Sequence, residues 1–402
     1  MRDYPMVKKA VVLAAGEGKR LRPFTETMPK VMLPVANKPI LEYVFDAIRE
    51  AGINDVLCIV GYKKEVIQEY FKDYTKLTIT YITQDKQLGT SHALLQAQAH
   101  VKEPFILLPG DNIIDSQSIK KLIDTPADYA ILIKKHPHPS KYGVIFFKNN
   151  KISQIVEKPK EDIGEYISTG IYKLPASIFL DLDRCAAQGI YALSTVIQTI
   201  IDNQKKINTT LADLWMDIVY PWDLIHVNEV MSHRLNAAIS GTIEKNVTMK
   251  GPVCIGKDTK IYAGCYIVGP AIIGDNCEIG PNACLFPSTT IGNNVAIHPF
   301  TEIRNSVIMD DVHIGSNSLV LHSVIGKGCT TGHTFSTLAQ KTTIEIEDEY
   351  KHLTTPIGTM IGEDCVIDSH VTVHPGIIIG RKCTIGAMTK IQQPIPSETN
   401  VM

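Results

Sequence analysis

The stretch LAAGEGKRLRPFTETMPKVMLP, residues 13–34, runs from a short apolar strand into a glycine-rich loop. Gly16 and Gly18 lack β-carbons, so the backbone there can approach a ligand closely and direct its N–H groups toward it. Cations follow at Arg20, Arg22 and Lys30, and three prolines stiffen the segment that carries them. Since guanidinium and ammonium groups neutralise phosphate, the stretch predicts a polyphosphate site.

This loop differs from two common phosphate-binding motifs. Gly18-Lys19 is followed by Arg20, where a Walker A motif has serine or threonine, and no earlier glycine lies at the required spacing. The loop also lacks the third glycine of the dinucleotide-binding fingerprint. Neither motif therefore describes this phosphate site.

The pattern L-x-x-G-x-G-x-R-L, followed by P-K and a further proline, resembles the signature of sugar-1-phosphate nucleotidylyltransferases. The resemblance implies that a phosphate oxygen of a sugar 1-phosphate attacks the α-phosphorus of a nucleoside triphosphate and that pyrophosphate leaves. It implies that Arg20 stabilises the pyrophosphate and that Lys30 contacts the phosphoryl oxygens. The residues that it assigns to nucleotide binding here are Leu13, Ala15, Gly16 and Gly18.

Length and composition narrow the possible classes of protein. A chain of 402 residues is too long for one ordinary core, so two domains are expected. With 40 Lys and Arg against 42 Asp and Glu, a nucleic-acid partner is not expected. No apolar run reaches the length of a membrane span, and the start MRDYPMVKKA lacks a signal-peptide core. The nine cysteines form no C-x-x-C pair, which favours reduced thiols, no zinc site and a cytoplasmic protein.

The first half of the chain alternates strand-like runs with amphipathic helical stretches, which is typical of βαβ units on a mostly parallel sheet. The expected strands are 10–15, 56–60, 78–81, 105–108 and 129–133. A helix is expected from Ile40 to Glu50, ended by Gly52, and helix formers over 222–239 close this half. We therefore expect a Rossmann-like nucleotidyltransferase domain with a mixed, mostly parallel sheet at residues 1–240. The loops after the first, third and fourth strands should meet in one crevice.

The second half shows a six-residue period that no helix or alternating strand produces. One series holds Ile255, Ile261, Ile267, Ile273, Ile279, Leu285, Ile291, Ile297 and Ile303, and another holds Ile361, Ile367, Val373, Ile379, Ile385 and Ile391. This is the hexapeptide repeat of a parallel β-helix, which we place at residues 245–396. Between the series the phase slips at Ile308, Ile314, Val320 and Ile325, and residues 330–356 are expected to leave the repeat. The resemblance implies that the β-helix is left-handed and that the protein is a homotrimer.

The remaining candidate residues follow the predicted strands of the first half. Asp111 comes directly after the run FILLPG, where a carboxylate suits an octahedral Mg²⁺ ion. The resemblance pairs it with Asp217 as the second metal ligand, and it assigns pyrimidine recognition to Gln84, Gly89 and Thr90. It assigns Lys158 to holding the sugar phosphate, as a third catalytic residue beside Arg20 and Lys30. The residues that it places around the sugar phosphate are Gly143, Glu157, Lys158, Thr169 and Gly170.

The same two-domain layout occurs in bifunctional enzymes that also acetylate an amino sugar phosphate from acetyl-CoA. Alignment without gaps places Ser316 where those enzymes have the catalytic histidine and Leu319 where they have a tyrosine. A serine cannot replace imidazole as a base near neutral pH. A register shifted by seventeen residues would bring in His333 but leaves Ser336 for the tyrosine. We therefore expect a degenerate acetyltransferase site and a β-helix that mainly assembles the protein.

The sequence leaves the substrates open. Gln84 and Gly89 favour UTP or dTTP, with glucose 1-phosphate or N-acetylglucosamine 1-phosphate as the leading acceptors, and His92 leans toward uridylyl transfer to amino sugars. The alternatives are a bifunctional uridylyltransferase/acetyltransferase that makes UDP-N-acetylglucosamine, a mannose-1-phosphate guanylyltransferase and a non-catalytic scaffold. The scaffold is disfavoured because the phosphate-binding and metal-binding residues are all present.

Overall fold

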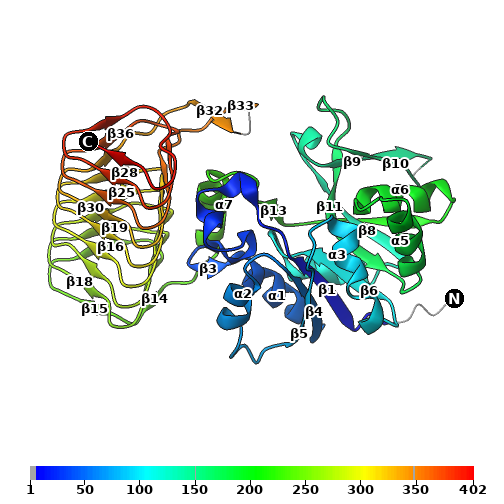
Figure 1. The fold of residues 1–402 in the computed structure, drawn as a ribbon. Coiled ribbons are helices and arrows are strands. Elements are labelled where there is room, and N and C mark those ends of the chain that lie inside the picture. Colours follow the sequence, from blue (N-terminus) through cyan, green and yellow to red (C-terminus); the bar gives the residue numbers. More distant parts are fainter. Residues whose placement is uncertain (1–5, 150, 347–348) are drawn as a thin grey trace. The chain divides into compact units, whose positions relative to one another are not determined.

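The computed structural model describes residues 6–149, 151–346 and 349–402, which divide into two compact units (Figure 1). The first unit comprises the chain up to Glu17 together with Pro29–Met32 and Ile40–Asp217. The second comprises Gly18–Met28, Leu33–Pro39 and Ile218–Met402. The glycine-rich loop is thus shared between the units. The domain limits 1–240 and 245–396 stay a prediction.

The first unit is built on a nine-stranded mixed sheet, in which β10-β9-β11-β6-β1-β4-β5 lie side by side and β8 joins β11 to β12. The strands β6, β1, β4 and β5 are parallel, whereas β11 runs antiparallel to β6, β8 and β9. The strands are β1 (Lys9–Ala14), β4 (Asp55–Val60), β5 (Thr78–Thr83), β6 (Phe105–Pro109), β8 (Tyr129–Lys135), β9 (Gly143–Lys148), β10 (Lys151–Glu157), β11 (Tyr166–Leu174) and β12 (Ile207–Leu211). The predicted mixed sheet is confirmed.

Helices pack against this sheet, and a two-stranded ribbon extends from it. The helices are α1 (Ile40–Glu50), α2 (Lys64–Tyr70), α3 (Thr90–Leu95), α4 (Ser116–Ile123), α5 (Ile178–Ala187) and α6 (Leu193–Asp202). The ribbon pairs β7 (Asn112–Ile114) with β13 (Trp215–Asp217). The predicted helix 40–50 is confirmed, and the φ of +93° at Gly52 explains why glycine ends it.

The helix-rich stretch 222–239 was predicted too long. The helix α7 spans Asp223–Ser232, and β14 (Ala238–Ile239) is already a strand, parallel to β17 (Val253–Ile255). Ile239 pairs with Ile255, which is sixteen residues further on and not eighteen, so β14 lies outside the six-residue series and the sequence pattern missed it. The repeat domain therefore begins its hydrogen bonding before residue 245.

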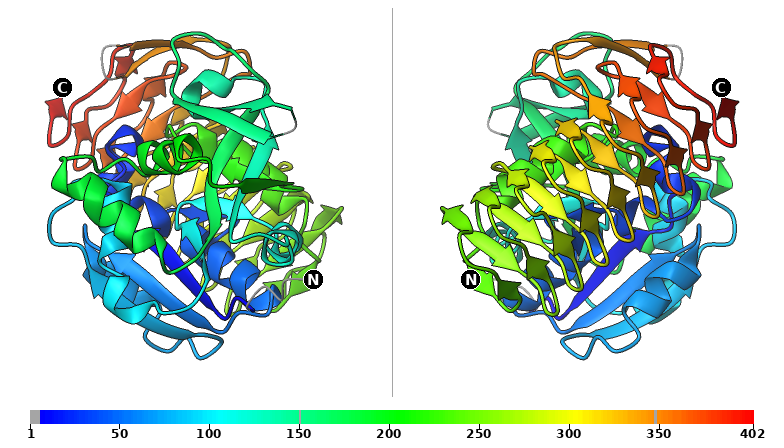
Figure 2. Two further views of the ribbon diagram at one scale, coloured as in Figure 1. Left: turned by 90° about the vertical axis from the view of Figure 1, so that its right-hand side faces the viewer. Right: turned by 90° about the vertical axis from the view of Figure 1, so that its left-hand side faces the viewer.

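The second unit contains three parallel sheets of eight, nine and eight short strands that wind into a β-helix (Figure 2). The first sheet holds β14, β17, β20 (Ala271–Ile273), β23 (Thr289–Ile291), β26 (Val307–Ile308), β29 (Val324–Ile325), β34 (Met360–Ile361) and β37 (Ile378–Ile379). The second holds β15 (Thr242–Ile243), β18 (Lys260–Ile261), β21 (Glu278–Ile279), β24 (Ala296–Ile297), β27 (His313–Ile314), β30 (Thr330–Thr331), β35 (Val366–Ile367), β38 (Thr384–Ile385) and β40 (Asn400–Val401). The third holds β16 (Thr248–Lys250), β19 (Tyr266–Val268), β22 (Cys284–Leu285), β25 (Glu302–Arg304), β28 (Leu319–Leu321), β31 (Ser336–Thr337), β36 (Thr372–Val373) and β39 (Lys390–Ile391).

The aliphatic residue of every predicted hexapeptide is buried in one continuous core. Ile255, Ile273 and Ile291 are register partners on successive coils of eighteen residues, three hexapeptides each. The phase slip has a simple cause: Ile291 pairs with Ile308, seventeen residues on, and Ile308 with Ile325. Two coils therefore have seventeen residues and not eighteen, and Ile308 and Ile325 still point into the core.

The prediction that residues 330–356 leave the repeat was wrong for their first part. Thr331 and Thr337 take inward positions on β30 and β31, and Phe335 between them is fully buried. The hydroxyl of Thr337 accepts a hydrogen bond from the N–H of Leu321, so a polar side chain is tolerated inside. Polar residues at aliphatic positions concealed the coil. The excursion itself is the hairpin of β32 (Thr343–Ile346) and β33 (Glu349–His352).

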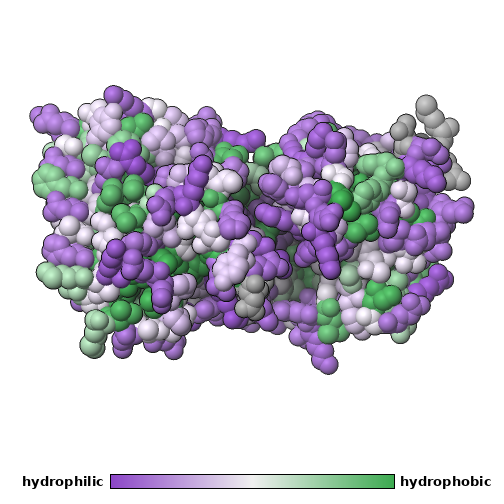
Figure 3. All heavy atoms as spheres, turned by 90° about the horizontal axis from the view of Figure 1, so that it is seen from above, coloured by the Kyte–Doolittle hydropathy of each residue, from purple (hydrophilic) through white to green (hydrophobic). Residues whose placement is uncertain are grey.

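Polar residues cover much of the face shown in Figure 3. Within the residues that the structure describes, no helix is long and apolar enough to cross a membrane. All nine cysteines are free thiols, and seven of them are buried. These seven side chains pack in the interior of the protein.

Candidate active site

The loops after β1 and β5 meet at Ala15, and Gly110 after β6 donates its N–H to the carbonyl oxygen of Leu13 at 2.8 Å, so the three predicted loops converge. The carbonyl oxygen of Ala15 accepts hydrogen bonds from the N–H of Tyr62, at 3.1 Å, and from the side-chain amide of Gln87, at 2.8 Å. A β-carbon on Gly61 would lie only 2.9 Å from that oxygen. The loops after β1, β4 and β5 are therefore held together at one edge of the sheet.

The charged centre of this edge is Lys30. Its Nζ lies 2.6 Å from Oδ2 of Asp111, which follows β6, and 3.0 Å from Oδ1 of Asp217, the last residue of β13. The ribbon explains the meeting of the two carboxylates, because Asp217 pairs with Asn112, the residue after Asp111. Three residues that lie far apart in the sequence and were singled out from it are thus brought together.

Burial and charge act in opposite directions on this lysine. Burial disfavours the ammonium form, but the charges of Asp111 and Asp217 and their hydrogen bonds outweigh it and raise the pKa of Lys30 above its ordinary value. Its side chain is only 12% exposed. Lys30 is therefore a permanent cation held between two carboxylates.

A second cluster surrounds Gln84, which follows β5 and is 4% exposed. Its Nε2 lies 3.3 Å from the carbonyl oxygen of Gly89 and 2.9 Å from Nδ1 of His92. A carbonyl can only accept, so the amide group must point its NH₂ toward Gly89, and Nδ1 of His92 then accepts as well. The other amide atom, Oε1, is the acceptor of this side chain.

The backbone of Tyr191 fixes the start of α3 in this cluster. Its carbonyl oxygen accepts a hydrogen bond from the N–H of Ser91 at 3.0 Å, and it would lie 2.4 Å from a β-carbon on Gly89. The Gly89 φ of +150° also disfavours any other residue. The hydroxyl of Thr90 accepts from the N–H of Leu193 at 3.1 Å. Sequence reasoning missed Tyr191, because a backbone oxygen far along the chain leaves no motif.

The residues predicted for the sugar phosphate lie on β9, β10 and β11. Gly143 pairs with Glu157, and a β-carbon on Gly143 would lie 3.1 Å from Oε2 of that glutamate. Lys158 follows with a φ of 42° and donates its N–H to the carbonyl of Tyr142 at 3.0 Å. The left-handed backbone there turns the chain directly after the strand.

Thr169 and Gly170 lie at an irregularity of β11. The hydroxyl of Thr169 donates to the carbonyl of Leu132 at 2.7 Å, so this buried side chain is already used within the protein. A β-carbon on Gly170 would lie 3.0 Å from the Pro109 ring, at the end of the strand that leads to Asp111. The residues predicted for the sugar phosphate on β11 therefore lie next to the end of β6, which leads to Asp111.

Gly18 and Arg20 belong to the second unit. Gly18 has a φ of +75°, and its carbonyl accepts a hydrogen bond from the buried hydroxyl of Thr25 at 2.9 Å. Lys351 and then Arg20 lower the pKa of Glu349 on the hairpin strand β33. The role of Arg20 toward pyrophosphate stays a prediction, as do the ligand roles of Leu13, Ala15 and Gly16.

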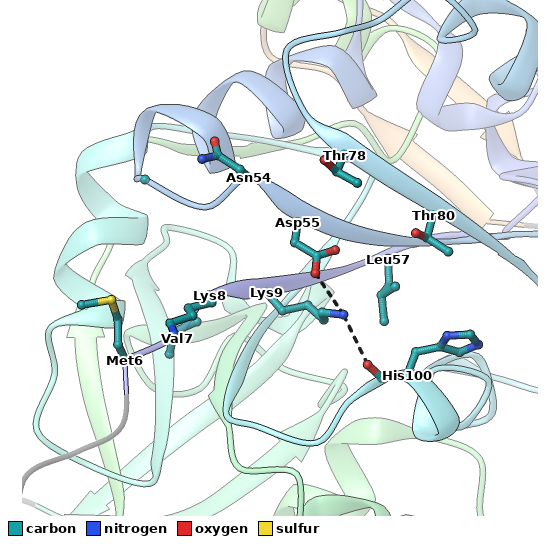
Figure 4. Close-up of a pocket in the computed structure, with 11 residues that line it drawn as sticks. Met6, Val7, Lys8, Lys9, Asn54, Asp55, Leu57, Thr78, Thr80 and His100 are labelled. Carbon is teal, nitrogen blue, oxygen red and sulfur yellow. Dashed lines mark hydrogen bonds and ion pairs between the residues drawn. The ribbon is translucent and has the colours of Figure 1, made fainter.

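A pocket of 520 Å³ lies at the opposite edge of the same sheet (Figure 4). It is lined by Lys9, Asp55 and Thr78, the first residues of β1, β4 and β5. Lys9 Nζ lies 3.0 Å from Oδ2 of Asp55 and 3.3 Å from the carbonyl oxygen of His100. Since ligands of open α/β sheets gather at the carboxyl ends of the strands, this pocket is not the candidate site.

Three family descriptions match the chain. "Nucleotidyl transferase" matches residues 9–233, "GMPPB C-terminal domain" residues 267–348 and "Bacterial transferase hexapeptide (six repeats)" residues 358–393. The hexapeptide match agrees with the coils of the structure. The predicted left-handed β-helix is confirmed.

Curated relatives extend along nearly the whole chain. "Bifunctional protein GlmU" of Methanococcus maripaludis is 34% identical over an alignment of 402 residues, gaps included, that covers 98% of this chain and 96% of that protein. A "bifunctional sugar-1-phosphate nucleotidylyltransferase/acetyltransferase" of Sulfurisphaera tokodaii is 33% identical and covers 92% and 94%. "UTP--glucose-1-phosphate uridylyltransferase AglF" of Haloferax volcanii is 38% identical over 225 residues, 54% of this chain and 93% of that protein.

A solved structure supports the fold. A Bacillus anthracis protein, described as a glucose-1-phosphate thymidylyltransferase in complex with sucrose, aligns with a TM-score of 0.52 and 24% identity. The alignment covers 57% of this chain and 97% of that one. Because one family description covers more than half of the sequence and relatives above 30% identity run along almost all of it, the protein belongs to the nucleotidyl transferase family, as a member with a hexapeptide-repeat β-helix.

Proposed function

We propose that the protein transfers a nucleotidyl group from UTP or dTTP to glucose 1-phosphate or N-acetylglucosamine 1-phosphate, giving a nucleotide sugar and pyrophosphate. The observation that carries the proposal is Lys30 held between Asp111 and Asp217 beside the strand-end loops. Relatives named for transfer to sugar 1-phosphates support this class of acceptor. Such a reaction needs no covalent intermediate, so catalysis consists of positioning and charge stabilisation.

The residues of the chain divide this work. Lys158 would hold the phosphate of the sugar in line with the α-phosphorus, and Glu157 would accept hydrogen bonds from sugar hydroxyls. Lys30 would neutralise charge on the phosphoryl group under attack, with its own proton retained because its pKa is raised. Arg20 would do the same for the departing pyrophosphate.

The carboxylates of Asp111 and Asp217 fit a divalent ion, and we propose Mg²⁺. Both lie within 3.0 Å of one Lys30 nitrogen, so the two carboxylates face the same positively charged position. Mg²⁺ is commonly bound by one or two carboxylates together with substrate phosphates, which matches this donor set. When bound, the ion would supply positive charge that offsets the negative charge of the reacting phosphates.

The orientation of the Gln84 amide favours a pyrimidine with an N3–H group. With its NH₂ facing Gly89 and His92, Gln84 presents Oε1, which can accept from uracil or thymine but meets only an acceptor at N3 of cytosine. His92→Leu, which removes the acceptor that orients the amide, is expected to lower the preference for UTP over CTP at least tenfold. His92→Asn places an oxygen near the Nδ1 position and should retain it. The measurement is kcat/KM for both triphosphates, and an unchanged ratio in the leucine variant would contradict this reading.

Gly16 offers a test of close ligand approach. No heavy atom lies within 4 Å of the position of a β-carbon on Gly16, so Gly16→Ala should fold with an unchanged melting temperature. If the triphosphate approaches this backbone, the added methyl group should raise the KM for the triphosphate about tenfold or more. Titration of both substrates measures this, and the KM for the sugar 1-phosphate serves as the internal control. A variant with wild-type values for the triphosphate would remove Gly16 from the site.

The proposal as a whole is tested by pyrophosphate release across four triphosphates and four sugar 1-phosphates. We expect the highest kcat/KM with UTP or dTTP and with glucose or N-acetylglucosamine 1-phosphate. A dominant signal with GTP and mannose 1-phosphate would favour guanylyl transfer instead. If no pair of substrates releases pyrophosphate, the non-catalytic scaffold is the remaining alternative.

Acetyl transfer is the second candidate function, because full-length relatives are named as bifunctional. In the structure His333 lies one coil beyond Ser316, so the seventeen-residue shift corresponds to one turn of the β-helix. Nδ1 of His333 accepts a hydrogen bond from the N–H of Ser316 at 3.2 Å. Its neutral ring then carries the proton on Nε2 and has no free acceptor, which disfavours a catalytic base. Rapid CoA release from acetyl-CoA and glucosamine 1-phosphate would reverse this conclusion.

We also propose that the protein is a cytoplasmic homotrimer assembled through the β-helix. The third sheet of the β-helix presents apolar side chains outward, since their neighbours Ile267, Leu285 and Val320 point into the core. These outward residues are Tyr266, Phe286, Leu319 and Leu321. Light scattering should give three times the chain mass of 44.4 kDa, and a monomer would contradict the assembly.

A further inference from the structure

The loop that carries Lys30 is anchored on both sides within the second unit. Lys30 lies in the short segment Pro29–Met32 of the first unit, but the segments before and after it, Gly18–Met28 and Leu33–Pro39, belong to the unit of the β-helix. Lys30, which contacts two carboxylates of the first unit, is therefore held by flanking segments that belong to the second unit.

The downstream flank is a tight hairpin of β2 (Pro34–Val35) and β3 (Lys38–Pro39). Its turn residues Ala36 and Asn37 have φ values of 48° and 59°. The left-handed conformation costs an alanine about 1 kcal/mol, so surrounding contacts must impose it. Those contacts come from α7 and the β-helix.

Asn228 in the middle of α7 provides the main contact and is completely buried. Its Oδ1 accepts hydrogen bonds from the N–H of Ala36, at 2.9 Å, and from the hydroxyl of Thr290, at 3.1 Å. Its Nδ2 donates to the carbonyl of Ser288 at 2.9 Å. One amide thus joins the hairpin turn to the coil around β23. The side chain of Asn37 adds a hydrogen bond to the carbonyl of Ile291 on the same strand.

The upstream flank is fixed to a different coil. The hydroxyl of Ser397 lies 3.2 Å from both carboxylate oxygens of Glu26. Burial raises the pKa of Glu363, and the hydroxyl of Thr27, the next residue of that flank, offsets part of this rise. Glu363 follows β34, three strands from β23 in the sheet, roughly 14 Å at about 4.8 Å per strand. The two anchors are therefore independent of each other.

We propose that Asn228 is a positioning residue for nucleotidyl transfer, which ties the lysine loop to the β-helix and so fixes where Lys30 can reach. The β-helix then serves the reaction itself as well as assembly. The effect on catalysis rests on the proposed function, whereas the anchor rests on the hydrogen bonds alone. Asn228 is completely buried, so it acts on the reaction only through the loop.

The test compares Asn228→Ala with Asn294→Gly in the full-length protein. Asn294 also follows β23, has a φ of 58° that glycine adopts freely, and donates to Asp311 on the outside of the β-helix. In Asn228→Ala we expect hydrogen exchange of the Ala36 amide to rise at least tenfold and kcat to fall about tenfold. The KM for the sugar 1-phosphate should change less than twofold. The control variant should match the wild type in all three measurements.

A double-mutant cycle with Lys30→Ala separates positioning from general damage. If Asn228 acts through Lys30, Asn228→Ala should lower kcat less than twofold further in the Lys30→Ala background. An equal loss in both backgrounds, or unchanged exchange at Ala36, would overturn the proposal. If Asn228→Ala does not fold, Thr290→Val replaces it, because it removes only the hydrogen bond from Thr290 to Asn228. Hydrogen exchange of the Ala36 amide and kcat should then change in the same directions, but by smaller factors. A wild-type protein without any turnover would instead refute the proposed function. Hydrogen exchange of the Ala36 amide would then still show whether Asn228 anchors the loop.

Discussion

Asp111→Asn is expected to lower kcat by a factor on the order of 10² to 10³ with little change in melting temperature. The amide keeps the size of the carboxylate but loses its charge, so the divalent ion would be held by Asp217 alone. Lys30 retains Asp217 at 3.0 Å as a partner, which limits the effect on folding. Steady-state kinetics over a Mg²⁺ titration should show a higher requirement for the ion in the variant.

Asp55→Asn is the matched control for this experiment. Asp55 begins β4 at the opposite edge of the sheet, pairs with Lys9 at 3.0 Å and takes no part in the proposed site. Loss of this partly exposed ion pair should cost less than about 1 kcal/mol of stability and leave kcat at the wild-type value. If Asp111→Asn behaved like this control, the metal assignment would be withdrawn.

Lys30→Met should abolish most of the activity and also change how the protein responds to metal. Methionine has a similar length but no charge, so the phosphoryl group loses its cation and kcat should fall on the order of 10²-fold or more. Without Lys30, Asp111 and Asp217 lose the cation that both of them contact, which should destabilise the metal-free protein by about 3 kcal/mol. Thermal unfolding with and without Mg²⁺ measures this, and the ion should raise the melting temperature more in the variant than in the wild type.

Lys30→Arg separates charge from geometry at the same position. The guanidinium keeps the positive charge between the carboxylates and should restore most of the lost stability. Its planar fork cannot occupy the place of a compact ammonium, so activity should stay low. Full activity of Lys30→Met would show that the cation takes no part in the reaction.

The fold could be predicted wherever burial leaves a periodic signal. The six-residue spacing of aliphatic residues placed almost every coil, and the helix over residues 40–50 was correct at both ends. The pattern failed at Thr331 and Thr337, where hydrogen-bonded hydroxyls replace aliphatic groups inside the β-helix. It failed again at the strand β14, whose Ile239 lies sixteen residues before its partner Ile255 and therefore outside the six-residue series.

The candidate site was predictable where chemistry needs a particular side chain after a strand. Lys30, Asp111 and Asp217 were all singled out before their meeting was known, and the structure joins them within 3.0 Å. Residues that act through backbone atoms or single buried hydrogen bonds carried no such signal. Tyr191 contributes a carbonyl oxygen, and Asn228 is one asparagine on an ordinary helix. Only the tertiary structure reveals their partners.

The central claim is that the bond broken in the triphosphate lies between the α- and β-phosphates. UTP labelled at the α-phosphate and UTP labelled at the γ-phosphate, each incubated with glucose 1-phosphate and Mg²⁺, test it directly. With nucleotidyl transfer, the α-label enters the nucleotide sugar and the γ-label is released as pyrophosphate. A γ-label found in the sugar product or in orthophosphate would contradict nucleotidyl transfer.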